Sequence, residues 1–400
     1  MKPTHRFATA VIVFLIAALA AMPAMARGTS KASPPPTSNA SGPLTLTVDC
    51  SKGQTIAHAL EQGDARKELV VIVRGTCNEN VAINRDKVTL QGDPGTGATV
   101  NAPNASANAI AVAGADIGIV GLTVTGGSNG ISAIGVPGFG VQGSIIQNAA
   151  QYGIRVTSSH ANIAGNTIQY SGNHGVFFSA ANGRVQNNQI RSNAMAGVHL
   201  ERLSAVAIGG NTITANGSNG VELLSRSYSD LMNNTIASNG TNPAVRRNGV
   251  FLNFAYADMG GNSITDNPGA GVWADASGLS SQDQTISGNG GFGMMGYLGS
   301  TLVLNPGTIV QNNNGDGVQL HTNSIGQITG ATIQFNAWGG IRLMLGSKLL
   351  IYGPPASTVG GNQGYGLECA DAESSEWIGY SVDFNPPNTL GAISPSCTGF

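Results

Sequence analysis

Three ionisable side chains stand out in a chain that carries little charge. His199 and Glu201 are separated by one residue, and Glu222 follows in an equivalent segment further along the chain. An imidazole beside two carboxylates can supply a base and an acid, because neighbouring carboxylates push their pKa values apart. Whether these residues meet depends on how the elements that carry them are arranged. A repeat in the sequence predicts that arrangement.

The chain repeats a segment typified by residues 211–224, which read NTITANGSNGVELL. Aligned on an isoleucine, it returns at intervals of 22 to 28 residues, at Ile146, Ile168, Ile190, Ile213, Ile236, Ile264, Ile286, Ile309 and Ile333. A period in the twenties is typical of a solenoid, in which each unit buries its apolar face only against its neighbours. We therefore predict a stack of coils.

The composition supports this prediction and excludes other classes. Glycine accounts for 57 of 400 residues, which suits a fold that turns sharply several times per repeat and disfavours a helical one. Charged residues make up 10% and the net charge is -2, so electrostatics do not favour nucleic acid or an anionic membrane surface as a partner.

The N-terminus has the pattern of a secretory signal peptide. Lys2 and Arg6 precede an apolar run over residues 7–21, and small residues lead to a predicted cut after Ala26. A membrane anchor is disfavoured because the run is shorter than the ~20 residues that a span needs. We expect a signal peptide over 1–26, a disordered Ser/Pro-rich leader over 27–43, and one β-helix domain over 44–400, secreted or periplasmic and not inserted in the membrane.

Four cysteines in an exported chain suggest disulfides, with three connectivities open. Cys50 and Cys77 bracket the entry to the repeats and Cys369 and Cys397 bracket the exit, so pairing within each end is favoured. The alternative, a metal site, lacks CxxC or Cys/His spacing. Each disulfide would staple one end of the stack.

The open apolar ends of a solenoid must be covered. Residues 44–48 alternate like a strand, and residues 55–68 contain a short helical pattern with Ile56, Ala59 and Leu60 on one side. We predict an N-terminal cap with a short helix over 44–80, a C-terminal cap over about 366–400, and about a dozen coils between them.

Asparagine recurs in two registers of the repeat. The registers hold Asn166, Asn188, Asn211, Asn234 and Asn262, and then Asn193, Asn216, Asn239, Asn267, Asn289, Asn312 and Asn336. Asparagine tolerates left-handed turns, and stacked amides can hydrogen-bond from coil to coil. We expect structural ladders, with glycan acceptor sites at Asn211 and Asn234 as the alternative.

A strand follows the glycine of each repeat, and its first and third residues are apolar, as in Val198 and Leu200. Alternation puts these residues inside and the residues between them outside. Because stacked strands lie about 4.8 Å apart, outward residues form two columns. The first contains Arg155, Phe177, His199, Glu222, Phe251, Trp273 and Arg342, and the second contains Glu201, Asp275, Tyr297 and His321.

The NTI…N…GV repeats, the asparagine registers and the helical cap resemble the right-handed parallel β-helix families, the pectin-lyase-like group of pectate lyases, polygalacturonases and mannuronan epimerases. The resemblance covers roughly residue 44 to the C-terminus. It implies an all-β, right-handed, single-stranded parallel β-helix and a polysaccharide partner.

No catalytic signature of these families carries over. The segments at 152–157 and 197–201 lack the Asp-Pro-His of the epimerases, and only Asn173, His174, Gly175 and an isolated Arg342 are similar in type to the polygalacturonase segments. The acidic cluster with which pectate lyases bind Ca²⁺ is missing from the sequence. We predict no cofactor and assign no metal-binding residue, and Ca²⁺ is left open as an alternative that nothing in the residues supports.

We expect a monomeric polysaccharide-active protein, lyase or hydrolase in type, that binds a glycan along the outward columns. His199 and Glu201 would act as base and acid, with Glu222 as a partner carboxylate. Aromatic faces bind sugar rings, and the expected substrate-binding residues are Arg155, Phe177, Phe251, Trp273, Asp275, Tyr297, His321 and Arg342.

Two alternatives remain open. In the first, the outward His, Glu and Arg residues are ordinary residues of a soluble surface. The protein would then be a non-catalytic glycan-binding or cell-surface structural protein. The longer coil around Asn242 to Asn248, with Arg246 and Arg247, is also a candidate cover for Phe251 and Trp273.

Overall fold

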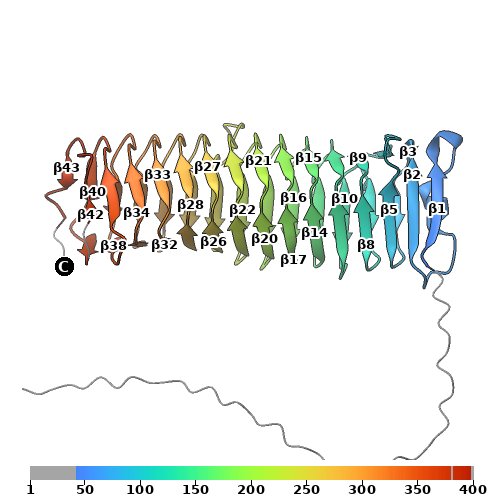
Figure 1. The fold of residues 1–400 in the computed structure, drawn as a ribbon, viewed down its shortest axis with the longest axis horizontal. Coiled ribbons are helices and arrows are strands. Elements are labelled where there is room, and N and C mark those ends of the chain that lie inside the picture. Colours follow the sequence, from blue (N-terminus) through green and yellow to red (C-terminus); the bar gives the residue numbers. More distant parts are fainter. Residues whose placement is uncertain (1–41, 380–381, 398–400) are drawn as a thin grey trace, which may run out of the picture. The chain divides into compact units, whose positions relative to one another are not determined.

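The computed structural model describes residues 42–379 and 382–397, which form a stack of coils with strands in three parallel sheets (Figure 1). The predicted β-helix is confirmed. The sheets have 15, 14 and 14 strands and are called A, B and C here. The expected signal peptide and most of the expected leader lie outside the described residues. None of the helices described is long and apolar enough to cross a membrane.

Sheet A consists, in order, of β1 (Leu44–Asp49), β2 (Leu69–Arg74), β5 (Val88–Gly92), β8 (Ile117–Val120), β11 (Phe139–Gln142), β14 (His160–Ala164), β17 (Asn182–Gln186), β20 (Ala205–Gly209), β23 (Tyr228–Met232), β26 (Tyr256–Gly260), β29 (Gly278–Gln282), β32 (Thr301–Leu304), β35 (Ile325–Ile328), β38 (Lys348–Ile351) and β41 (Ser375–Ile378). Sheet B consists of β3 (Thr76–Asn78), β6 (Thr99–Ala102), β9 (Thr123–Gly126), β12 (Ile145–Gln147), β15 (Thr167–Gln169), β18 (Gln189–Arg191), β21 (Thr212–Thr214), β24 (Thr235–Ala237), β27 (Ser263–Thr265), β30 (Thr285–Ser287), β33 (Ile309–Gln311), β36 (Thr332–Gln334), β39 (Ser357–Gly360) and β42 (Val382–Asp383). Sheet C consists of β4 (Val81–Ile83), β7 (Ile110–Val112), β10 (Ile131–Ile134), β13 (Ile154–Thr157), β16 (Val176–Ser179), β19 (Val198–Glu201), β22 (Val221–Leu224), β25 (Val250–Asn253), β28 (Val272–Asp275), β31 (Met294–Tyr297), β34 (Val318–His321), β37 (Ile341–Met344), β40 (Tyr365–Cys369) and β43 (Gly391–Ile393).

The stack has more coils than the dozen expected, since sheet A alone contains 15 strands. The first coils cause the difference. They lack the Asn and Gly repeat of the later coils, yet they join the same sheets through alternating Val, Ile and Leu residues, as where β5 pairs with β8. Regular apolar alternation is therefore enough to build a coil without the repeat signature.

The interior is built from the apolar residues that point inward at alternate positions of each strand. Val198 and Leu200 of β19 are fully buried, as predicted for the first and third residues of each strand that follows a glycine. The aligned isoleucines are also buried, with one correction. In β33 the core residue opposite Ile286 is Val310, while Ile309 is partly exposed, because this coil is one residue longer before the anchor.

Both asparagine ladders are present inside the turns. In the first ladder, Nδ2 of Asn188 donates to Oδ1 of Asn211 (3.0 Å), and Nδ2 of Asn211 donates to Oδ1 of Asn234 (3.0 Å). The second ladder runs from Asn193 to Asn388 and contains Asn313 where Asn312 was expected. Asn312 is exposed with a left-handed backbone, a consequence of the same shift that replaces Ile309 with Val310 in the core.

The glycine before each strand of sheet C from β10 to β37 is required by close packing between coils. A Cβ added at Gly220 would lie 2.4 Å from Cγ2 of Ile236 and 2.8 Å from the carbonyl oxygen of Gly249. Any side chain here would therefore push neighbouring coils apart. This contact places the post-glycine strands, and with them the two outward columns, in register.

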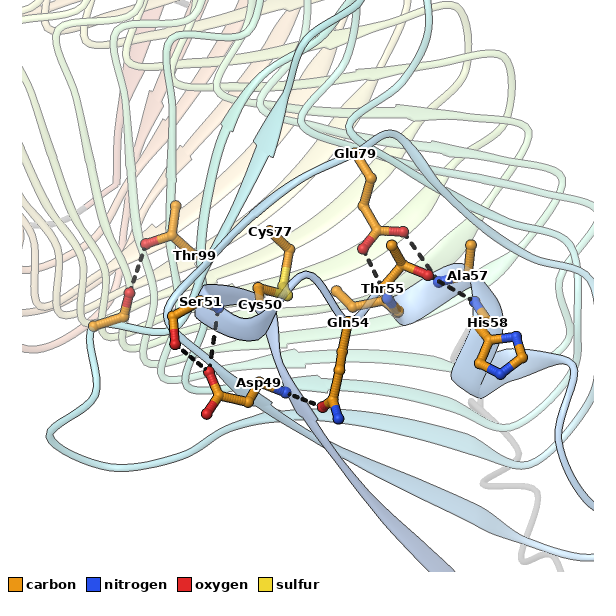
Figure 2. The surroundings of a disulfide bond; sticks show 12 residues. Asp49, Cys50, Ser51, Gln54, Thr55, Ala57, His58, Cys77, Glu79 and Thr99 are labelled. Carbon is orange, nitrogen blue, oxygen red and sulfur yellow. Dashed lines mark hydrogen bonds between the residues drawn. A yellow bond between two sulfur atoms is a disulfide. The ribbon is translucent and has the colours of Figure 1, made fainter.

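The N-terminal cap has the predicted helix, shortened to α1 (Ile56–Leu60), after the 3-10 turn η1 (Cys50–Lys52) (Figure 2). The side chain of Thr55 accepts the N–H of His58, and the Glu79 carboxylate accepts the N–H groups of Ile56 (2.7 Å) and Ala57 (3.0 Å). These bonds satisfy N–H groups at the start of the helix that have no partner inside it.

A disulfide staples each end of the stack, as the spacing of the cysteines predicted. Cys50 pairs with Cys77, which ties η1 to β3, and Cys369 pairs with Cys397 beyond β43. The two terminal coils are the ones that have a neighbour on one side only, so a covalent link there opposes fraying.

Candidate functional site

The two predicted columns run along the outer face of sheet C, and we call this face the strip. In its first column Phe177 lies opposite His199, and His199 lies opposite Glu222. In the second column Ser179 lies opposite Glu201. The stacking thus brings the three candidate catalytic residues together, as the repeat predicted.

The strip is more buried than an outward face would suggest. Only 6% of His199 and 2% of Phe251 is exposed, and Phe177 is also buried. The rings of Tyr152, Phe177 and His199 stack on each other, with centroids 4.5 and 5.4 Å apart along the series. Side chains of neighbouring coils therefore cover one another, which leaves little of Phe177 or Phe251 as an open platform for a sugar.

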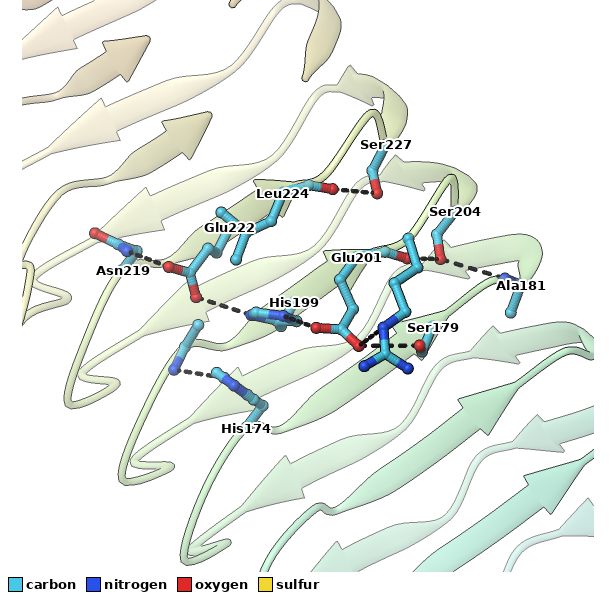
Figure 3. Close-up of polar contacts among 12 residues, drawn as sticks. His174, Ser179, Ala181, His199, Glu201, Ser204, Asn219, Glu222, Leu224 and Ser227 are labelled. Carbon is cyan, nitrogen blue, oxygen red and sulfur yellow. Dashed lines mark hydrogen bonds and ion pairs between the residues drawn. The ribbon is translucent and has the colours of Figure 1, made fainter. Parts of the chain in front are cut away.

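His199 is held between two carboxylates (Figure 3). Its Nδ1 lies 2.8 Å from Oε2 of Glu222, and its Nε2 lies 3.7 Å from Oε2 of Glu201. When the ring is neutral and donates Nδ1–H to Glu222, its lone pair is on Nε2, the nitrogen that faces Glu201. The geometry suits a base oriented by one carboxylate and accompanied by a second.

The two carboxylates have different surroundings. Glu222 is enclosed, and burial by itself would raise its pKa, but the hydrogen bond and charge of His199, together with Arg246, lower the pKa on balance. Nδ2 of Asn219 also donates to Glu222 (3.3 Å). Glu201 instead accepts from Oγ of Ser179 (3.0 Å) and pairs with Nε of Arg202 (3.3 Å).

His174 is a member of this cluster that the sequence predictions did not assign to the site. Its ring stacks on His199 at 4.3 Å, and its Nδ1 accepts the N–H of Ala196 (3.1 Å). Burial, followed by the proximity of His199, lowers the pKa of His174 to about 3, so the ring is neutral. The signal that could have located it is its register, because Asn219 and Asn248, also just before the glycine, accept the same kind of backbone bond.

The donor atoms of His174, His199 and Glu222 lie within 4.8 Å of one another, a spacing compatible with a metal ion. The hydrogen bonds do not fit that role. Because Nδ1 of His174 accepts a backbone N–H, the neutral ring carries its proton on Nε2 and has no free lone pair there. The tautomer of His174 therefore does not suit a metal ligand, and His174 meets His199 by ring stacking while His199 bonds to Glu222.

A pocket of about 420 Å³ adjoins this cluster on the strip. Its walls are Arg246, Arg247, Asn248, Phe251, Trp273, Asp275 and Tyr297. The guanidinium of Arg246 lies 3.9 Å from the centre of the Phe251 ring, so the longer coil covers Phe251 as the sequence alternative proposed. Trp273 and Tyr297 meet edge to face at 6.4 Å and remain partly exposed. Of Phe177, Phe251 and Trp273, Trp273 is the one that stays partly exposed.

The remaining predicted binding residues are distributed along the strip. Asp275 and Tyr297 are neighbours, and the ring of His321 lies 5.2 Å from that of Tyr297. Arg342 is in the other column, where its Nε lies 3.6 Å from Glu368. Arg155 lies opposite Phe177, toward the N-terminal end. Asp275, Tyr297 and His321 thus follow one another along the second column.

The chain belongs to the right-handed β-helix family. The model described as "Right handed beta helix region" matches residues 120–281 and 275–378. The strip and its pocket are accordingly features on the outer face of a right-handed parallel β-helix.

Two solved structures illustrate the likeness of fold. The A-module of the mannuronan C-5 epimerase AlgE6 of Azotobacter vinelandii has a TM-score of 0.50 and 14% sequence identity, over 86% of this chain and 92% of that chain. A double mutant of the periplasmic alginate epimerase AlgG has a TM-score of 0.50 and 12% identity, over 84% of this chain and 83% of that one. No curated protein matches the sequence.

Proposed function

We propose that this protein is a polysaccharide-active enzyme of the lyase type that acts on an acidic glycan bound along the strip. The observation that carries the proposal is the hydrogen-bonded His199–Glu222 pair beside a pocket with two arginines. Glu222 lies opposite Phe251, and Phe251 lines the pocket together with Arg246 and Arg247. A base and a set of cations for a sugar carboxylate are thus neighbours.

The chemistry follows from these positions. Arg246 and Arg247 would bind the carboxylate of a uronic acid, which stabilises the negative charge that develops when the adjacent carbon loses its proton. Nε2 of His199 would take that proton, the electron pair would form a carbon–carbon double bond, and the glycosidic carbon–oxygen bond would break. Glu201 would act as the acid that gives a proton to the departing oxygen.

Hydrolysis is less well supported by the same geometry. A glycoside hydrolase needs two carboxyl groups free to act on the glycosidic bond and on water or the sugar. Here Glu222 is committed to His199 and Asn219, which leaves Glu201 as the one carboxyl of the cluster without a bond to His199 at hydrogen-bonding distance.

The test is turnover of polyuronates, such as polymannuronate and polygalacturonate, followed by the ultraviolet absorbance of unsaturated products. Glu222→Gln removes the carboxylate that orients the base His199 and is expected to lower the rate about 100-fold or more, because general-base catalysis contributes on that scale. His160→Ala removes an exposed histidine on sheet A and should leave the rate unchanged. The proposal is lost if the wild type forms no product, or if His199→Ala and Glu201→Ala both retain the full rate.

A second candidate, non-catalytic glycan binding, is favoured by the burial of His199, whose two ring nitrogens both face carboxylates. In that case the wild type would bind polyuronate without product, and replacing both Arg246 and Arg247 by alanine would abolish binding.

We also propose that the protein is exported and monomeric. Disulfides at both ends suit an oxidising compartment, and one structure of similar fold is named as periplasmic. Amino-terminal sequencing of the mature protein should find Arg27 as its first residue, and an intact signal segment would contradict this. Analytical ultracentrifugation tests whether the protein is monomeric in solution.

A further inference from the structure

A second groove lies away from the strip, at the corner where the chain turns from sheet C into sheet A. It has a volume of about 870 Å³ and extends over the turns that follow β19, β22, β25, β28 and β31. Leu203 and Phe254 stand on the turns, and Tyr228 and Tyr256 stand at the start of the adjoining strands. The groove therefore runs across several coils in the direction of the stack.

Leu203 occupies a backbone conformation that does not suit it. Five turns at this corner have three residues, and each closes with a serine hydroxyl that donates to the carbonyl three residues earlier, as Ser204 and Ser227 do (Figure 3). The middle residue is left-handed in all five, and these residues are Leu203, Arg226, Gly299, Asn323 and Gly346. Glycine and asparagine suit a left-handed residue, whereas leucine does not. Leu203 is also 69% exposed, so it gains no burial in return.

Phe254 shows the same conflict in the shorter turns. Its left-handed position is filled by Ser158, Ala180 and Ala276 in the equivalent turns of other coils. The phenylalanine ring is 61% exposed, although a small residue would satisfy the turn. Leu203 and Phe254 are both strained and exposed within one groove, and the strain and the exposed apolar surface together suit a binding site.

The tyrosines add aromatic surface and fixed polar groups. The rings of Tyr228 and Tyr256 are stacked within 7° of parallel at 6.0 Å, and both are exposed. The hydroxyl of Tyr228 contacts Asp230 and Asp258, and that of Tyr256 contacts Asp258 (3.1 Å). The next residue in this column is Gly278, where an added Cβ would lie 2.9 Å from Cδ2 of Tyr256, so the Tyr256 ring leans over this glycine.

We propose that this groove binds a neutral polysaccharide that runs along the stack. Aromatic faces match the apolar faces of sugar rings, and the carboxylates of Asp230 and Asp258 can accept hydrogen bonds from sugar hydroxyls. The groove is also lined by Arg202, which pairs with Glu201, and by Arg226, so its cations and the two nearby carboxylates roughly balance, whereas the pocket on the strip contains Arg246 and Arg247 beside Asp275 alone. The groove thus differs from the strip in charge and takes a different ligand.

The test uses replacements that already occur at the equivalent positions of this chain. Leu203→Gly follows Gly299, and Phe254→Ser follows Ser158, so the double variant should fold with unchanged or higher resistance to unfolding. Its affinity for a soluble neutral β-glucan or a galactomannan, measured by calorimetry, should fall at least tenfold. Its affinity for polyuronate should not change.

Leu345→Ser is the matched control, because Leu345 is also an exposed left-handed leucine at this corner but lies outside the groove. It should bind neutral glycans as the wild type does. The proposal is overturned if the wild type binds neither neutral glycan or if the double variant binds as tightly as the wild type. It is also overturned if the wild type is a dimer that the double variant dissociates, since the groove would then be a surface for a second copy of the chain. A double variant that unfolds more easily would likewise contradict it, because Leu203 and Phe254 would then serve the fold.

Discussion

Asp316 is a carboxylic acid in a place where other coils have an amide. Its Oδ1 accepts the N–H of Gly339 (2.7 Å), as the amide oxygens of Asn219 and Asn248 accept the backbone of their next coils. The residue is 1% exposed, and its Oδ2 has no hydrogen-bond partner within the described residues. Burial raises the pKa of Asp316 from about 3.8 to about 6.

This shift predicts a pH-dependent stability. Below pH 4 the carboxyl is protonated in the folded and the unfolded chain, so its titration does not lower the free energy of unfolding. Between pH 4 and 6 only the unfolded chain ionises, so stability falls as pH rises, by roughly 3 kcal/mol in total. Asp316→Asn keeps the acceptor and removes the titration. We expect the variant to be more stable than the wild type at pH 7 and similar at pH 4.

Urea unfolding between pH 4 and 7.5 measures this difference directly. Asp116→Asn, a change at an exposed aspartate with a left-handed backbone, is the control. A stability difference between Asp316→Asn and the wild type that stays constant over this pH range would show that the pKa of Asp316 is the same in the folded and the unfolded chain, contrary to the shift.

At the scale of the element, the asparagine ladders connect the coils through their turns. Asn211 uses both ends of its amide, since Nδ2 donates to Val185 and Asn234 while Oδ1 accepts from the backbone and side chain of Asn188. The amide is buried, so water cannot replace these bonds. The same burial argues against Asn211 as a glycan acceptor in the folded protein.

Asn211→Ala should therefore be strongly destabilising. Several buried donors and acceptors would lose their partners, and each such group costs about 1–3 kcal/mol. We expect a loss of about 3 kcal/mol or more in the free energy of unfolding, measured by chemical denaturation. Asn314→Ala, at an exposed turn position, should lie within about 0.5 kcal/mol of the wild type. A similar small effect at Asn211 would mean that the ladder is not a main source of stability.

At the scale of the whole molecule, a stack in which each coil contacts only its neighbours is weakest at its ends. The disulfide between Cys369 and Cys397 closes a segment of 28 residues at one such end. Replacing both cysteines by serine should cost about 3 kcal/mol for the terminal coils. Hydrogen exchange should become faster in β40 and β43 and stay unchanged in central strands such as β19 and β22.

The matching change at Cys50 and Cys77 is the control, because it should accelerate exchange in β1 to β3 instead. If removing either disulfide accelerated exchange equally throughout the stack, the molecule would unfold as one cooperative unit and the caps would not act locally.

The sequence by itself determined the period, the inward positions such as Val198 and Leu200, the pairing of the cysteines and the alignment of His199 with Glu222. These features were predictable because a solenoid maps sequence spacing directly onto distance, one coil per repeat. The same rule failed where a coil departs from the repeat. The first coils lack the Asn and Gly pattern and were undercounted, and one coil is a residue longer, so Ile309 was chosen in place of Val310.

Only the tertiary structure decided how the side chains of neighbouring coils cover one another. The stacking of His174 on His199, the placement of Arg246 over Phe251 and the exposure of Leu203 and Phe254 at the corner depend on rotamers and on loops from neighbouring coils. Periodicity specifies where each Cα lies and which way its side chain leaves the strand. Burial, hydrogen-bond partners and pKa depend on the atoms that pack around that side chain, and those come from several coils at once.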